Sequence, residues 1–129
     1  MANKVKHIFL VDDDFITLSI GKTVLKDNYF VTTLQSGEEL LHFLTAVKPD
    51  LILLDVLMPG ICGYDTIKNI KANPQTAEIP VIFLSGKHDA NNVILGLSLG
   101  AVDYIKKPFL PMFLLKRVES HLLTSDHTV

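Results

Sequence analysis

The sequence predicts an α/β fold, in which a doubly wound parallel sheet of five strands lies between two layers of helices. Five short apolar runs predict strands near residues 6–11, 30–34, 50–54, 80–84 and 102–105. The runs LILL and VIFL are apolar on consecutive residues, as in central parallel strands that are covered on both faces. Helical segments separate the runs, and this regular alternation implies right-handed crossovers and one parallel sheet.

Local signals support the individual elements in chain order. Apolar residues recur at helical spacing after the first two strands, at Ile16, Ile20 and Val24 and then at Leu40, Leu41 and Leu44. Ser36, with Glu39 three residues later, is a capping-box signature for the start of the second helix. Pro49 and Pro80 precede the third and fourth strands, where a helix could not continue.

The composition is that of one domain with a core of its own. The chain has 129 residues, a net charge of -2 and no basic cluster larger than the pair Lys106 and Lys107, so we expect no direct nucleic-acid binding. No apolar stretch is long enough for a signal-peptide core or a membrane span. The single cysteine, Cys62, suits a reducing compartment, and a cytoplasmic protein is expected.

Polar side chains with related chemistry follow four of the five strands. The first strand is followed by Asp12 and Asp13, the third by Asp55, the fourth by Ser85 and the fifth by Lys107. The carboxyl ends of parallel strands meet at one edge of the sheet, so these groups are expected to converge there. Asp14 is expected only to cap the first helix or to place a charge in its first turn.

The expected cluster has the chemistry of a cation and phosphoryl site. Carboxylates without sulfur or imidazole ligands favour a hard cation, and Mg²⁺ is the natural choice. The cation would offset the repulsion among the acids. Lys107 and Ser85 could hold the oxygens of a transferring phosphoryl group while Asp55 attacks as a nucleophile.

The chain resembles the receiver domain of bacterial two-component response regulators over nearly its whole length. The matching pieces are FLVDDD, DLILLDVLMPGICG, IPVIFLSG, GAVDYIKKPF and LLKRVESHLL, in this order. The resemblance implies a flavodoxin-like (βα)5 fold with strand order 2-1-3-4-5. It also implies a receiver domain over residues 1–124, followed by a frayed tail or the start of a linker at 125–129.

The resemblance implies a role for each matching site residue. Asp55 would be the phosphoacceptor, and Ser85 and Lys107 would bind the phosphoryl oxygens. The implied Mg²⁺ ligands are Asp12, Asp13, Asp55 and the backbone carbonyl of Leu57. The peptide bond from Lys107 to Pro108 would be cis. Tyr104 would turn inward when Ser85 moves toward the phosphoryl group, or it is only an aromatic side chain of the last strand.

The resemblance also implies partners. A histidine kinase or phosphotransfer protein would donate the phosphoryl group, and phosphorylation would switch the face made by the fourth helix, fifth strand and fifth helix. On this face the apolar residues expected to form an interface with an output domain, a target protein or a second copy are Ile94, Leu95, Met112 and Phe113. The alternative is that these residues pack in the core.

Two other functions compete with the expected one, a phosphoacceptor switch that is not itself an enzyme. Asp12 and Asp14 form an Asp-x-Asp pair after a strand, as in aspartyl phosphatases of the haloacid dehalogenase type. Ile16 departs from the Thr or Val of that pattern, and Asp55 comes before Lys107 in the chain rather than after it. A degenerate receiver that acts only by docking is disfavoured because every chemical position is filled.

Overall fold

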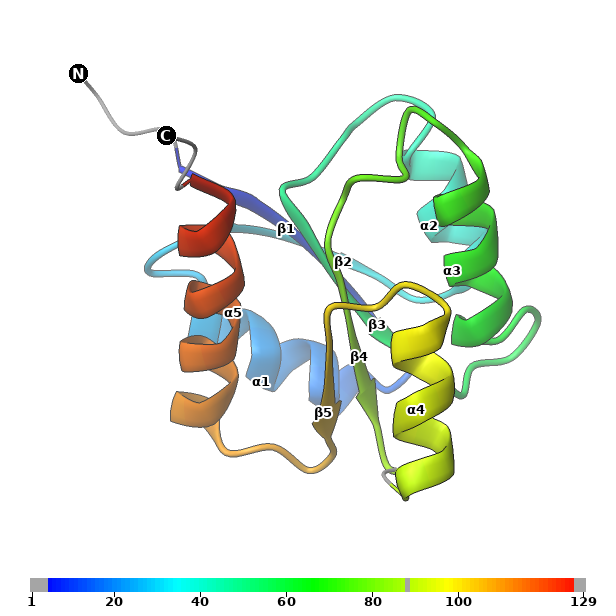
Figure 1. Ribbon diagram of the computed structural model, residues 1–129. Coiled ribbons are helices and arrows are strands. Elements are labelled where there is room, and N and C mark those ends of the chain that lie inside the picture. Colours follow the sequence, from blue (N-terminus) through cyan, green and yellow to red (C-terminus); the bar gives the residue numbers. More distant parts are fainter. Residues whose placement is uncertain (1–4, 88, 127–129) are drawn as a thin grey trace.

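The computed structural model describes residues 5–87 and 89–126, and it contains the expected α/β fold (Figure 1). Five parallel strands form one sheet in the order β2-β1-β3-β4-β5. Their bounds are β1 His7–Val11, β2 Phe30–Leu34, β3 Leu51–Asp55, β4 Val81–Ser85 and β5 Asp103–Lys106. The predicted fold class and strand order are both confirmed, and β3 is the central strand, with β1 on one side and β4 on the other.

Three strands, β3, β4 and β5, end one residue later than the sequence predicted. Asp55 and Ser85 are the last residues of β3 and β4, where they pair in register with Leu84 and Lys106 of the neighbouring strands. The apolar pattern stops before these polar residues, but the backbone ladder continues through them. Both side chains are therefore held by the rigid sheet rather than by a loop.

Helices cover both faces of the sheet. Helices α1 (Phe15–Leu25) and α5 (Pro111–Asp126) lie on one face, and α2 (Gly37–Phe43), α3 (Gly63–Ala72) and α4 (Ala90–Ser98) lie on the other (Figure 1). Each layer buries its own apolar core against the sheet. One core is centred on Leu10, Leu53 and Leu114, and the other on Phe9, Leu54 and Phe83.

Helix α1 begins as predicted but packs with a different face. The Asp14 side chain caps it by accepting a hydrogen bond from the Ile16 backbone N–H at 3.1 Å. The buried residues are Thr17, Leu18, Gly21 and Leu25. Ile16 and Ile20, whose spacing with Val24 indicated the helix, are 66% and 45% exposed and face away from the core, whereas Val24 packs against it.

The start of α2 confirms the predicted cap at Ser36. Ser36 Oγ accepts a hydrogen bond from Glu39 N at 3.0 Å, which satisfies one backbone donor of the first turn. The Glu39 carboxylate reaches back one residue further than in a regular capping box, because it accepts a hydrogen bond from Gln35 N at 2.7 Å and Gln35 precedes the cap.

Among the helices in the described part of the chain, none combines the length and apolar composition that a membrane span requires. Of the expected tail at 125–129, residues 127–129 lie outside the described residues, and α5 continues through Asp126.

Candidate phosphoryl and metal site

A half-buried lysine and three carboxylates meet at the carboxyl edge of the sheet. Lys107 Nζ lies 2.7 Å from Asp12 Oδ2 and 3.4 Å from Asp55 Oδ1. Asp12 is fully buried and Asp55 is 5% exposed, whereas Asp13 is exposed. One carboxylate oxygen from each of Asp12, Asp13 and Asp55 lies within 4.8 Å of the others. The expected convergence of these residues from β1, β3 and the end of β5 is therefore present.

The surrounding backbone fixes the two buried acids. Asp12 Oδ1 accepts a hydrogen bond from Asp14 N at 2.9 Å, which leaves Oδ2 for Lys107. After Asp55 the chain turns back closely, and Gly63 N donates to Val56 O at 2.7 Å. A side chain at Gly63 would meet the Asp55 carbonyl oxygen at 2.4 Å, so glycine is required where α3 begins against the end of β3.

The electrostatics of the cluster disfavour charge on Asp55. Burial, followed by the repulsion from Asp12, raises the pKa of Asp55 from 3.8 to about 7, although Lys107 acts in the opposite direction. For Lys107, burial lowers the pKa, but the hydrogen bond to Asp12 and the charge of Asp55 outweigh it and raise the pKa overall. One lysine is thus shared between two carboxylates, and the cluster carries an excess of negative charge.

The donor set fits a hard divalent cation. The three acids offer only carboxylate oxygens, and Asp13 is open to solvent, so a Mg²⁺ ion could keep several of its water ligands. A cation at this position would also lower the cost of ionising Asp55. Leu57, two residues beyond Asp55, lies in the loop before α3 with its side chain 55% exposed.

Ser85, at the end of β4, is held next to Lys107, which directly follows β5. It is 1% exposed, its carbonyl oxygen accepts a hydrogen bond from Lys107 N at 2.9 Å, and its hydroxyl oxygen accepts one from Lys87 N at 2.9 Å. The Lys107–Pro108 peptide bond is cis, as the resemblance implied. Nothing lies within 4 Å of a side-chain position at Gly86, so the approach to this corner is open.

Tyr104 is buried within the core that faces α4. Its side chain is 6% exposed and its hydroxyl donates to the Lys87 carbonyl oxygen at 2.6 Å. The ring contacts Phe83 with a centroid distance of 5.7 Å. Tyr104 is therefore in the inward orientation, and it is joined through Lys87 to the backbone that also bonds Ser85.

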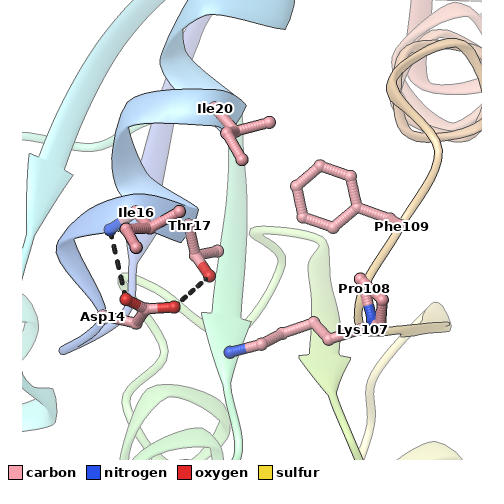
Figure 2. A pocket seen from close by; sticks show the side chains of 7 residues that line it. All are labelled: Asp14, Ile16, Thr17, Ile20, Lys107, Pro108 and Phe109. Atoms are coloured by element: carbon pink, nitrogen blue, oxygen red, sulfur yellow. Dashed lines mark hydrogen bonds between the residues drawn. The ribbon is translucent and has the colours of Figure 1, made fainter.

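A cavity of about 350 Å³ lies beside the acidic cluster, between α1 and the loop from β5 to α5 (Figure 2). Ile16 and Ile20 line one side, Phe109 lines the other, and Lys107 crosses the floor. The Asp14 carboxylate at its edge is engaged by Ile16 N and by the Thr17 hydroxyl, at 3.1 and 2.8 Å. Asp14 serves as the helix cap, as expected, so it does not form with Asp12 the carboxylate dyad of the phosphatase alternative.

The four residues expected at an interface are all exposed. Their exposed fractions are 64% for Ile94, 42% for Leu95, 62% for Met112 and 45% for Phe113, so the alternative of core packing is wrong. A groove of about 400 Å³ between α4 and α5 takes in Phe113 but is lined from α4 by Val93 and Leu97. Sequence reasoning did not single out these two α4 residues.

An ion cluster that lines part of this groove was also missed. Asp103 is 7% exposed and accepts hydrogen bonds from Arg117 Nε at 2.7 Å and from Arg117 Nη2. His121 Nε2 lies 3.0 Å from the same carboxylate. Burial alone would raise the pKa of Asp103, but the bonds from Arg117 and His121 lower it. Arg117 and His121 recur at i and i+4 on one helix, a signal that could have indicated a shared partner.

Comparisons with known proteins agree with this architecture. The model of the response regulator receiver domain family matches residues 8–119. A probable cyclic di-GMP phosphodiesterase of Vibrio cholerae is 42% identical over 115 residues, which are 89% of this chain and 26% of that protein. The response regulator SaeR of Staphylococcus aureus is 40% identical over 119 residues, which are 92% of this chain and 50% of SaeR.

Solved structures show the same fold. A putative response regulator from Chloroflexus aurantiacus is 36% identical with a TM-score of 0.88, and the match covers 93% of this chain and 99% of that one. The fold and site define a signalling domain of two-component systems. The chain belongs to the response regulator receiver domain family. The match covers about a quarter of the Vibrio cholerae protein and about half of SaeR. Membership of this family rules out the haloacid dehalogenase alternative.

Proposed function

We propose that this domain is a Mg²⁺-dependent phosphoacceptor switch in which Asp55 receives a phosphoryl group from a histidine kinase or phosphotransfer protein. The observation that carries the proposal is the contact of the half-buried Lys107 with both buried carboxylates, Asp12 and Asp55. An Asp55 oxygen would attack the phosphorus of a phosphohistidine, the P–N bond would break as the P–O bond forms, and the imidazole nitrogen would keep the electron pair and take up a proton.

Each remaining side chain of the site has a place in this reaction. Asp12, Asp13, Asp55 and the Leu57 carbonyl would hold Mg²⁺, which neutralises charge on the phosphoryl oxygens when it is bound. Lys107 would exchange its contact with Asp55 for a phosphoryl oxygen. Ser85 would donate its hydroxyl hydrogen to another phosphoryl oxygen, and its fixed position at the end of β4 supports this role.

The donor would dock on the apolar rim around this site, which comprises Phe15, Ile16, Ile20 and Phe109. Phe15 and Ile16 are 74% and 66% exposed, and Ile16, Ile20 and Phe109 line the cavity next to Lys107 (Figure 2). The cavity lined by these side chains lies next to Lys107, so a protein that contacts the rim could place its phosphohistidine near Asp55. Exposed apolar side chains there favour a helix with a complementary apolar face.

Phosphorylation would be communicated through Ser85 and Tyr104 to the α4-β5-α5 face. The groove between α4 and α5, with Phe113 on its wall, supports binding of an output domain, a target protein or a second copy at this face.

Intact-mass measurement tests the proposal. The protein is incubated with Mg²⁺ and acetyl phosphate or phosphoramidate, beside Asp55→Asn and an EDTA control. We expect one added phosphoryl group that is absent from both controls. An adduct that persists in Asp55→Asn would contradict the assignment of the acceptor, and no adduct with any donor despite bound Mg²⁺ would favour a docking-only receiver.

A further inference from the structure

The hydroxyl of Tyr104, on β5, lies against the hydroxyl of a second tyrosine, which is on helix α3. Tyr64, the second residue of α3, places its hydroxyl 3.0 Å from the Tyr104 hydroxyl. The Tyr64 hydroxyl also lies 3.0 Å from Asn92 Oδ1 and 3.3 Å from the Asn92 carbonyl oxygen, and Asn92 is in the first turn of α4. The two phenols therefore connect α3, α4 and β5 at one point.

The hydrogens of this cluster can be assigned by counting. Each phenol has one hydrogen to donate, and the Tyr104 hydrogen points to the Lys87 carbonyl at 2.6 Å. The Tyr104 oxygen can therefore accept the hydrogen of Tyr64, for which Asn92 is the competing acceptor. Burial and the bond to Tyr104 raise the pKa of Tyr64, so its hydroxyl stays protonated at neutral pH.

The ring of Tyr104 fits this position because α4 leaves a slot for it. Gly96 is the buried residue of α4, and a Cβ atom at this residue would lie 2.8 Å from Tyr104 Cδ2 and 3.0 Å from Phe83 Cδ2. The Tyr64 ring contacts Phe83 edge-on, with a centroid distance of 5.3 Å. Phe83 thus lies between the two tyrosine rings at the bottom of the slot.

We propose that Tyr64 is a positioning residue that holds Tyr104 inward through the hydroxyl pair, and that Gly96 provides the space this orientation requires. The proposal rests on the proposed phosphoacceptor function and adds α3 to its switch. When Tyr104 turns outward, it loses its bonds to Tyr64 and Lys87, and the Tyr64 hydrogen turns to Asn92. Tyr64 therefore favours the inward state selectively, and a ligand that requires that state binds better when Tyr64 is present.

The test measures the affinity for beryllofluoride, a mimic of the phosphoryl group, at saturating Mg²⁺ by amide NMR titration. Tyr64→Phe keeps the ring and its contact with Phe83 but removes the hydroxyl. We expect binding to weaken about two- to tenfold, the range for one neutral hydrogen bond. Tyr29→Phe is the matched control, because Tyr29 is a half-buried tyrosine packed against the opposite core, and we expect its affinity to be unchanged.

A double-mutant cycle separates positioning from general packing. In a Tyr104→Phe background the hydroxyl pair is already lost, so Tyr64→Phe should have no further effect on beryllofluoride affinity. Gly96→Ala should weaken binding in the same direction as Tyr64→Phe, because its methyl group would displace the inward ring.

The outcomes distinguish this inference from the function on which it rests. If the wild-type protein binds beryllofluoride and Tyr64→Phe binds equally well, the positioning role is refuted and the proposed function stands. An equal loss in the presence and absence of the Tyr104 hydroxyl would also refute it. A wild-type protein that does not bind beryllofluoride with Mg²⁺ would remove the proposed function and this inference together.

Discussion

Asp55→Asn should stabilise the metal-free protein at neutral pH but not at pH 4. Burial and the neighbouring Asp12 raise the pKa of Asp55 from 3.8 to about 7 in the folded protein. Between these two values the folded state binds a proton that the unfolded chain releases, so stability falls as the pH rises. The contribution of Asp55 is complete below pH 4 and is lost as the pH passes through about 7.

The size of this effect follows from the same shift. Each pKa unit corresponds to about 1.4 kcal/mol, so ionising Asp55 costs about 4 kcal/mol more in the folded protein than in the unfolded chain. The free energy of unfolding of the wild type, measured relative to Asp55→Asn, should therefore fall by about 4 kcal/mol between pH 4 and pH 8. The comparison with Asp55→Asn cancels other groups that titrate in this window, such as His7, whose pKa is lowered by burial.

Urea unfolding in EDTA, followed by far-UV circular dichroism because the chain has no tryptophan, gives both free energies. Adding Mg²⁺ should stabilise the wild type more at pH 7.5 than at pH 5, since the ion binds the ionised carboxylates. Parallel pH profiles for the wild type and Asp55→Asn in EDTA would refute the reasoning, because Asp55 would then ionise in the folded protein as it does in the unfolded chain.

Three further predictions follow from other contacts. Lys107→Met should tighten Mg²⁺ binding, because it removes a positive charge 2.7 Å from Asp12, and should weaken beryllofluoride binding about tenfold or more. Calorimetry measures both affinities, and a change of both in the same direction would contradict this prediction. Arg117→Met should lower the free energy of unfolding by about 1–2 kcal/mol by leaving a buried β5 carboxylate with one partner fewer, whereas the exposed neighbour Lys116→Met should not. Ile20→Glu should slow phosphotransfer from a phosphohistidine protein about tenfold but leave acetyl phosphate labelling unchanged, and equal slowing with both donors would exclude a docking role.

The sequence was sufficient for the strands and for the residues at their carboxyl ends. Consecutive apolar residues mark strands that are buried on both faces, and parallel strands bring their ends together whatever the details of packing. For this reason Asp12, Asp55 and Lys107 could be expected in one place before any distance was known. The ends of β3 and β4 were placed one residue early because hydrophobicity was used to mark the boundary, whereas the backbone ladder extends through Asp55 and Ser85.

Helix faces were harder to predict, because this chain has more apolar residues than its core can bury. In α1 the spacing of Ile16 and Ile20 indicates a helix equally well whether the stripe faces the sheet or the solvent. The buried face is made instead by Leu18, Gly21 and Leu25, two of which are ordinary apolar residues at the same helical spacing. Contacts between side chains from distant elements, such as Tyr64 with Tyr104, have no local signature at all.

The electrostatics of the site imply that readiness for phosphorylation depends on the metal. A carboxyl with a pKa of about 7 is protonated in a large fraction of molecules at neutral pH, and a protonated Asp55 is a poor nucleophile. Lys107 alone does not overcome this, because it is shared with Asp12, which lies closer to its ammonium group. A divalent cation on the same carboxylates adds the missing positive charge and lowers the pKa of Asp55. Mg²⁺ would thus prepare the acceptor as well as neutralise the donor, so the pH dependence of labelling should shift to lower pH as the Mg²⁺ concentration rises.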